Sequence, residues 1–314
     1  DSTLDTLMQQ VGGVAEADRQ KVIAQLLASP PGVAREDAIR VEEMEPTPDV
    51  LYISTDGVMY PTRYREAHPD RKGENRIVYQ EMKAACVFWR DRADQWHKRV
   101  LGGRDDSQRF GLSVWARAMR CGLAKVGAAV FISDGGAWCD TVAETYFPEA
   151  VRILDFYHLS EYVWNAAHGL YADSQDAAAW AKNCLHILKE SSGYCLLKHL
   201  ERSRAARQSA GTTKHSSAGT AAPPAAGTAA LDTLMNYLRP RLHMTDYSDY
   251  RAAGYVIGSG MMESTCKHLV GNRLKGSGRQ WHESGAVAMT ALNALRINRE
   301  WDRFWTTKPL QRAA

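Results

Sequence analysis

Three features are missing from the sequence, and each absence excludes a class of protein. No apolar run approaches the roughly 20 residues that span a bilayer, so we expect no membrane contact. The six cysteines include no CxxC pair and the chain shows no signal peptide, so we expect free thiols in a cytoplasmic protein. The net charge is only +3, which alone indicates no polyanionic partner.

The charge that is present is unevenly distributed along the chain. Residues 1–50 contain 4 Lys or Arg against 10 Asp or Glu, whereas residues 251–314 contain 10 against 4. We therefore expect a polyanion to bind at the C-terminal end. The first residue is Asp rather than Met, from which we expect a longer protein with an upstream module.

The hydrophobic pattern predicts an α/β protein. Helical spacing over 2–29, broken near Gly12 and Gly13, predicts two helices. β-Prone runs predict strands at 50–56, 77–89, 128–133 and 151–155. Between these runs, helices are predicted over 107–126 and in the residues before Phe147. An alternation of this kind is typical of a sheet covered by helices.

The second half of the sequence is mainly helical in its spacing. The exception is 202–230, a tract of Ser, Ala, Gly, Thr and Pro that is too poor in large apolar groups to pack, which predicts a disordered linker. We divide the chain into a helical segment at 1–49, the first part of a core at 50–158, an all-helical insertion at 159–255 that contains the linker, and a C-terminal helical part of the core at 256–314.

Aspartates end two of the predicted strands. Asp56 ends the first strand, where Gly57 permits a turn, and Asp134 ends the strand at 128–133. Ligands collect at the carboxyl edge of an α/β sheet, and carboxylates at neighbouring strand ends can share a hard cation. The alternative is that each Asp caps its own turn, because Asp-Gly is a common turn sequence.

A third acid lies at the start of a helix far along the chain. Glu263 falls in the first turn after Gly258 and Gly260. An acidic side chain is favoured there by the positive end of the helix dipole, so a capping role together with Ser259 is the alternative to a role in chemistry.

Several segments occur in one order: STDGVMYP at 54–61, ISDGGAW at 132–138, YFPEAVRILDFYH at 146–158, IGSGMMES at 257–264, RLKGSGRQW at 273–281 and NREWDRFW at 298–305. In these segments the chain resembles the bacterial insertion-sequence transposases of the ISKra type, relatives of the Mutator-like and other D-D-E transposases. The resemblance implies an RNase H-like mixed sheet with flanking helices, interrupted by an all-helical insertion. It also implies that Asp56, Asp134 and Glu263 are the catalytic, metal-binding triad.

Three carboxylates suit the reaction that the resemblance implies. Two divalent cations about 3.5–4 Å apart can activate an attacking oxygen and stabilise the leaving 3′ oxygen in a displacement at phosphorus. Mg²⁺ or Mn²⁺ suits such a sparse set of oxygen ligands better than a closed cage of His and Cys would. Water as the nucleophile would cleave DNA, and a 3′ hydroxyl would join strands.

Further residues receive roles from the same segments. Asp155 and His158 match a DxxH step of the related families, which implies that they shape the active-site neighbourhood; a core histidine held by a local bond is the alternative. We expect a basic stretch to bind phosphates and its tryptophan to stack on a base, with a solvated helix face and a buried Trp as alternatives. These residues are Lys267, Arg273, Lys275, Arg279 and Trp281.

The resemblance implies partners as well. We expect DNA, at transposon ends and at target sites, a homo-oligomer formed on that DNA, and association with the nucleoid. Such transposases usually carry a cysteine-paired zinc module and a helical end-binding segment upstream of the first Asp, and this sequence has neither. An RNase H-like nuclease or resolvase, a catalytically idle DNA-binding protein derived from a transposase, and a two-carboxylate glycosidase stay open.

Overall fold

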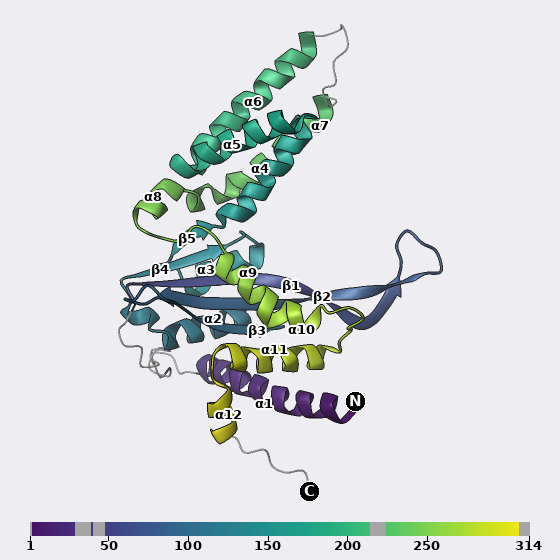
Figure 1. The fold of residues 1–314 in the computed structure, drawn as a ribbon, viewed down its shortest axis with the longest axis vertical. Coiled ribbons are helices and arrows are strands. Elements are labelled where there is room, and N and C mark those ends of the chain that lie inside the picture. Colours follow the sequence, from purple (N-terminus) through teal and green to yellow (C-terminus); the bar gives the residue numbers. More distant parts are fainter. Residues whose placement is uncertain (1, 29–38, 40–47, 214–223, 308–314) are drawn as a thin grey trace. The chain divides into compact units, whose positions relative to one another are not determined.

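The computed structural model describes residues 2–28, 39, 48–213 and 224–307 (Figure 1). Contacts within the chain divide it into two compact units. Unit 1 comprises Asp1–Phe131, Gly136–Val151 and Gly260–Ala314, and unit 2 comprises Ile132–Gly135 and Arg152–Ser259. Each unit is therefore built from segments that are far apart in the sequence.

A five-stranded sheet has the strand order β3-β2-β1-β4-β5. Its strands are β1 (Val50–Ala67), β2 (Asn75–Arg90), β3 (Trp96–Gly103), β4 (Ala128–Ser133) and β5 (Val151–Leu154). β2 is antiparallel to both β1 and β3. β1 and β4 are parallel, because their first residues lie side by side: Ala128 N donates to the carbonyl oxygen of Asp49, the residue before β1, at 3.0 Å. β4 and β5 are also parallel, since they end where Asp155 N donates to Ser133 O at 2.8 Å.

Helices precede, separate and follow these strands. Those of unit 1 are α1 (Ser2–Leu27), α2 (Ser107–Arg120), η2 (Leu123–Lys125), α3 (Ala137–Tyr146), α9 (Gly260–Thr265), η4 (Cys266–Gly271), α10 (Asn272–Leu274), α11 (Glu283–Ile297) and α12 (Trp301–Thr307). Those of unit 2 are α4 (Phe156–Leu170), α5 (Ser174–Glu190), α6 (Gly193–Thr213), α7 (Pro224–Leu238), η3 (Arg239–Met244) and α8 (Tyr247–Ala252). The predicted fold class, an RNase H-like mixed sheet with flanking helices and an all-helical insertion, is confirmed. Among the described helices, none is both long enough and apolar enough to span a membrane.

The first strand is longer than predicted. The prediction that Asp56 ends a strand and that Gly57 begins a turn is wrong, because β1 continues to Ala67 and pairs Gly57 with Lys83 of β2. The glycine serves a close approach instead: a Cβ at this position would lie 1.9 Å from Glu81 Oε1. Asp56 is therefore a residue of a continuous strand.

The two faces of β1 have different surroundings. Leu51 and Ile53 pack with residues of β2, α2 and α3 in a buried apolar cluster. Because successive side chains of a strand point to opposite faces, Asp56 lies on the other face. Both α9 and η4 contact β1, and Cys266 of η4 reaches the Asp56 side chain. Asp56 therefore lies on the face of the sheet that α9 and η4 cover, opposite the cluster that contains Leu51 and Ile53.

The N-terminal segment forms one helix rather than the two that were predicted, since α1 runs from Ser2 to Leu27 without a break at Gly12 and Gly13. Gly12 is buried against α11, where a Cβ would lie 2.4 Å from Ala288 O. The glycine therefore allows two helices to pack closely and does not end a helix. Residues 29–38 and 40–47 of the predicted 1–49 segment lie outside the described residues.

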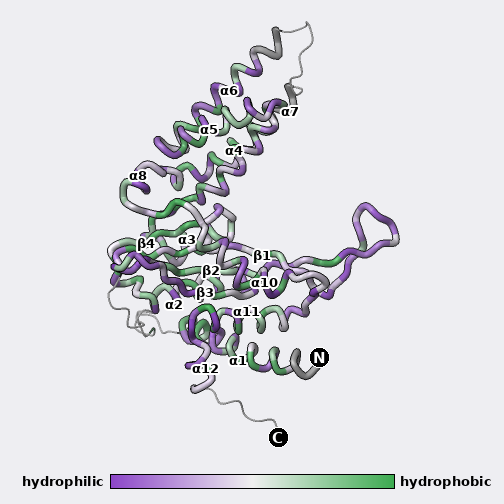
Figure 2. Tube along the Cα trace, viewed as in Figure 1, coloured by the Kyte–Doolittle hydropathy of each residue, from purple (hydrophilic) through white to green (hydrophobic). Residues whose placement is uncertain are grey.

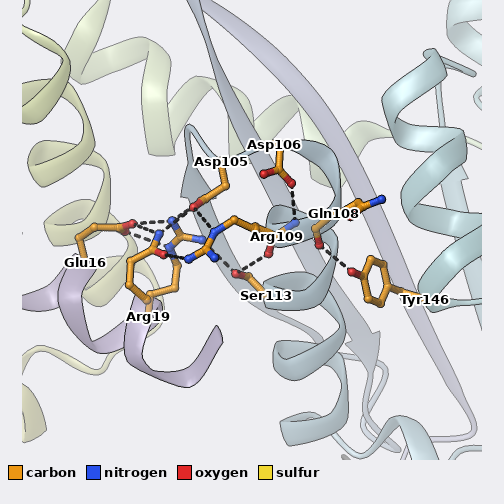
Figure 3. Close-up of polar contacts among 9 residues, drawn as sticks. Glu16, Arg19, Asp105, Asp106, Gln108, Arg109, Ser113 and Tyr146 are labelled. Carbon is orange, nitrogen blue, oxygen red and sulfur yellow. Dashed lines mark hydrogen bonds and ion pairs between the residues drawn. The ribbon is translucent and has the colours of Figure 1, made fainter. Parts of the chain in front are cut away.

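Polar contacts join α1 to the start of α2 (Figure 3). The Arg19 guanidinium donates to Glu16, to Asp105 and, at 2.9 Å, to Ser113 Oγ. Gln20 Nε2 donates to the other oxygen of Asp105 at 2.8 Å. The helix pair is thus fixed by a largely buried ion pair as well as by apolar packing between α1 and α2.

The tract predicted as a disordered linker is helical wherever the structure describes it. α6 continues through 202–213, and α7 begins at Pro224. Arg204 of α6 pairs with Asp232 of α7, with Nε 2.8 Å from Oδ1. Alanine, which is abundant in this tract, has the highest helix propensity, so the prediction underestimated its tendency to extend helices. Residues 214–223 lie outside the described residues.

Candidate active site

Asp56 is held in β1 with one oxygen bonded to the main chain and the other facing a helix. Its Oδ1 accepts a hydrogen bond from Gly57 N at 2.6 Å. Its Oδ2 lies 3.5 Å from Cys266 Sγ, which is a weak donor. The side chain is partly buried. These two contacts orient the carboxylate within β1.

Glu263 lies close to this contact along the helix. It is exposed in α9, and within the described part of the chain no hydrogen bond or ion pair to its carboxylate is found. Cys266 follows it by three residues, and side chains three apart are neighbours on one face of a helix. Because the Cys266 thiol touches Asp56, unit 1 packs the helix that carries Glu263 against the strand that carries Asp56.

The helix that carries Glu263 is fixed to the sheet from a second strand as well. Lys98 Nζ of β3 lies 3.4 Å from both Ser264 Oγ and Thr265 Oγ1. Immediately afterwards the helix changes to the π form over Cys266–Gly271, a wider turn that is often found at functional sites. The start of η4 is thereby placed over Asp56.

Cys266 was not singled out from the sequence. Burial raises the pKa of its thiol, and the charge of Asp56 and the hydrogen bond to it raise the pKa further. The thiol therefore stays protonated near neutral pH and acts as a donor to the carboxylate. Its position three residues after Glu263 was the one feature of the sequence that could have pointed to it. The contact itself is with Asp56, 210 residues away, and no local sequence pattern indicates such a contact.

Asp134 belongs to unit 2 and directly follows β4. Tyr237 Oη donates to its main-chain oxygen at 2.6 Å, and Arg241 Nη2 donates to Gly135 O at 2.7 Å. Gly135 has φ +75, a conformation that favours glycine. The loop after β4 is thus bound on its main chain by α7 and η3. That Asp134 shares a metal site with Asp56 and Glu263 stays a prediction.

Asp155 and His158 make separate contacts within unit 2. Asp155, only 5% exposed, caps α4 by accepting from Tyr157 N at 3.0 Å. It also accepts from Ser259 N at 3.2 Å and from the Ser259 hydroxyl. His158 Nδ1 lies 3.8 Å from Glu161 Oε2. Asp155 therefore ties the chain just before α9 to the start of α4, and the predicted role of both residues beside the active site stays a prediction.

The predicted DNA-binding residues lie in unit 1. All but Lys267, which is in η4, belong to a turn over residues 273–281 that pairs with β1, and we call these residues the basic turn. The four basic residues are exposed: Lys267, Arg273, Lys275 and Arg279. Trp281 is partly buried, and its indole Nε1 donates to Leu274 O at 3.1 Å. Its main chain pairs with β1, since Trp281 N donates to Pro61 O at 3.1 Å and Arg63 N to Trp281 O at 3.0 Å. Trp281 thus anchors the basic turn to the strand.

The donor set has the chemistry that Mg²⁺ or Mn²⁺ prefers. Asp56 offers an oxygen whose contact is a weak thiol donor, and Glu263 is exposed. Carboxylate oxygens are hard ligands suited to these ions. Across the described ranges, no group of three or more His, Cys, Asp or Glu side chains is close enough to hold a metal ion as it stands.

Known proteins show little similarity to this chain. No family model matches the chain, and no curated protein matches it. Among solved structures, the "Drosophila P element transposase strand transfer complex" is similar, with a TM-score of 0.37 and 10% sequence identity over 82% of this chain and 80% of that chain.

Proposed function

We infer that the chain is a DNA transposase of the D-D-E type, which cleaves DNA and transfers strands of an insertion sequence. The observation that carries this inference is the approach of the α9–η4 helix to Asp56, through the contact of Cys266 with Asp56 Oδ2 at 3.5 Å. This contact supports a site that Asp56 and Glu263 share, and the segments of the sequence that resemble such transposases supply the third carboxylate, Asp134.

Each acidic residue has a role in this proposal. Asp56, Asp134 and Glu263 would hold two divalent cations, Mg²⁺ or Mn²⁺, which supply activation of the attacking oxygen and stabilisation of the leaving 3′ oxygen. Asp56 is pre-oriented by Gly57 N, so little reorganisation of its carboxylate is needed. Glu263 is exposed on α9, from which it would approach the metal ions and bound DNA.

The basic turn completes the proposed site. Lys267, Arg273, Lys275 and Arg279 neutralise phosphates beside Glu263 and fix the position of DNA without reading its bases. Transposon ends and target DNA are the proposed partners, bound by a homo-oligomer.

The test is a cleavage and joining assay with labelled DNA that carries the element's ends, in Mg²⁺ and in Mn²⁺. Wild type should nick the DNA and join 3′ ends, and Asp134→Asn should keep fold and DNA affinity while losing both activities, because it removes a metal-binding charge and keeps the shape. Glu149→Gln, at an exposed acid of unit 1, is the matched control and should behave as wild type.

Three outcomes would redirect the proposal. Undiminished cleavage by Asp134→Asn would mean that another residue holds the metal. Cleavage without joining in wild type would favour the nuclease or resolvase. DNA binding with neither activity would favour the catalytically idle DNA-binding protein.

A further inference from the structure

β1 and β2 extend beyond the strands beside them as a two-stranded arm. β3 pairs with β2 only over Lys83–Arg90, whereas β1 and β2 stay paired out to Ala67 and Asn75. Figure 1 shows this end of the hairpin leaving the rest of the sheet, and Figure 2 shows its loop coloured as hydrophilic. We use the name arm for residues 62–78, all in unit 1.

The arm carries basic and aromatic side chains on its surface. It contains five Lys or Arg and three Asp or Glu. Arg76 pairs with Glu66 at 2.7 Å and Arg71 with Glu74 at 3.3 Å. The remaining cations, Arg63, Arg65 and Lys72, are exposed and have no acidic partner within the described residues. Tyr64 on the arm and Tyr79 beside it are about half exposed, at 51% and 53%.

The basic turn is bonded to the base of this arm. Besides the main-chain pairing of Trp281 with β1, Arg65 Nη2 donates to Gln280 Oε1 at 2.9 Å. In the turn, Arg273 and Lys275 are exposed and, among the residues that the structure describes, face no acidic partner, while Arg279 donates only to main-chain oxygens. Arm and turn are therefore joined by hydrogen bonds, and together they carry six exposed cations for which no acidic partner is found among the described residues.

We propose that the arm binds duplex DNA, as an extension of the phosphate-binding surface of the basic turn. The dimensions fit: a two-stranded ribbon enters a major groove roughly 12 Å wide, and the six β1 residues of the arm, at about 3.3 Å each, reach roughly 20 Å. Arg, Lys and Tyr are side chains that bind phosphate and sugar. The inference rests on the proposed function, because it names a second surface for the same DNA.

Length and charge of the arm can be tested separately. The pair Glu66 and Arg76 can be joined by Asn-Gly, a two-residue hairpin turn, in place of 67–75. That deletion removes two basic and two acidic residues, so it shortens the arm without changing the net charge. The second variant, Arg65→Ala with Lys72→Ala, removes two unneutralised cations and keeps the length.

The matched control is Arg92→Ala with Lys125→Ala. It removes the same charge from exposed positions at the other end of the sheet, after β2 and before β4. Binding of each full-length variant to a fluorescent 30-base-pair duplex is measured from 50 to 300 mM salt. Circular dichroism and the urea midpoint verify that every variant folds.

The expected results differ among the variants. Arg65→Ala/Lys72→Ala should lower the slope of log K against log salt by about 2, since each lost phosphate contact removes about 0.9. The shortened arm should lose affinity for duplex by several-fold while its affinity for single strands is unchanged. The control should match wild type in slope within about 0.5.

Other results would overturn the inference. If wild type binds and cleaves DNA while both arm variants match it, the arm does not bind DNA and the proposed function stands. If the arm variants match wild type on DNA but change the oligomeric state, the arm contacts a second copy of the chain. If wild type binds no duplex, the proposed function fails together with the arm.

Discussion

The regions around Asp56 and Asp155 show two ways in which a protein uses a strand-associated aspartate. Asp155 is buried and accepts hydrogen bonds from two main-chain amides and a hydroxyl. Asp56 is partly buried, and its contacts include a main-chain amide and a thiol. A buried carboxylate that accepts several hydrogen bonds stabilises the fold, whereas a carboxylate that is partly exposed to solvent can also bind a cation. In the sequence the two residues look alike, because each is an aspartate at the end of a β-prone run.

The largest expected effect comes from removing the charge at each aspartate in turn. Asp56→Asn should reduce DNA cleavage on the order of a thousandfold or more, because metal-stabilised charge is worth several kcal/mol in the transition state. Asp155→Asn should retain most of the cleavage rate, measured at a temperature where both variants are folded. Equal losses of cleavage in the two variants would erase the distinction between the regions.

Stability should follow the opposite order. Asp155→Ala removes the cap of α4 and leaves the Ser259 donors without an acceptor, which should lower the free energy of unfolding by about 2–4 kcal/mol. Asp56→Ala should lower it by less, about 1 kcal/mol, since Asp56 is partly exposed and water can replace part of its hydrogen bonding. Urea unfolding at pH 7 compares the two. A larger loss for Asp56→Ala would show that it, too, is mainly structural.

Asp105 provides a third carboxylate, held by an ion pair. Burial alone would raise its pKa, but the charge of Arg19 and the hydrogen bonds from Gln20 and Arg19 outweigh burial, so the pKa is lowered. A lowered folded-state pKa gives stability that is present above the unfolded value of about 3.9 and is lost as pH falls through the folded value. Wild type should therefore lose more stability than Asp105→Asn between about pH 5 and pH 2.

The matching measurement is the urea midpoint of both proteins across that range. Asp105→Asn should be less stable than wild type at pH 7, because Arg19 keeps its charge and loses a partner. The two curves should approach each other as the pH falls. Parallel curves would mean that Asp105 does not contribute to acid unfolding.

Residue patterns predicted the order of most elements, but not the extent of β1 or the existence of β3. β1 continues past Asp56 because 75–82 of β2 pairs with it, and a cross-strand partner is not visible in a local pattern. Gly57 has the sequence of a turn, yet its lack of a Cβ serves the Glu81 side chain. The segments predicted which residues are candidates for the chemistry, and that prediction stays open, whereas the position of Asp56 inside a strand could not be predicted from them.

The tract at 202–230 shows a second limit of prediction from sequence, because here regular structure was missed. Its composition is typical of a linker, but alanine favours helix, and the ion pair of Arg204 with Asp232 joins the two helices that extend into it. The Cys266 contact also depends on tertiary structure, because it joins η4 to a strand 210 residues away. Neither the pairing of Arg204 with Asp232 nor that of Cys266 with Asp56 can be predicted from local composition or spacing.

The smallest expected effect comes from the Cys266 thiol itself, and it tests how open Asp56 Oδ2 is. Weak hydrogen bonds are worth about 0.5–1 kcal/mol, which corresponds to roughly two- to fivefold in a dissociation constant. Cys266→Ala removes a donor that competes for this oxygen, so the Kd for Mn²⁺, measured by calorimetry, should fall by that factor. Cys266→Ser places a stronger hydroxyl donor there and should raise it. Cys195→Ala, at the exposed cysteine of unit 2, is the control and should leave the Kd unchanged. Changes in the same direction for Ala and Ser would show that the thiol only packs against Asp56, and that the metal uses other oxygens.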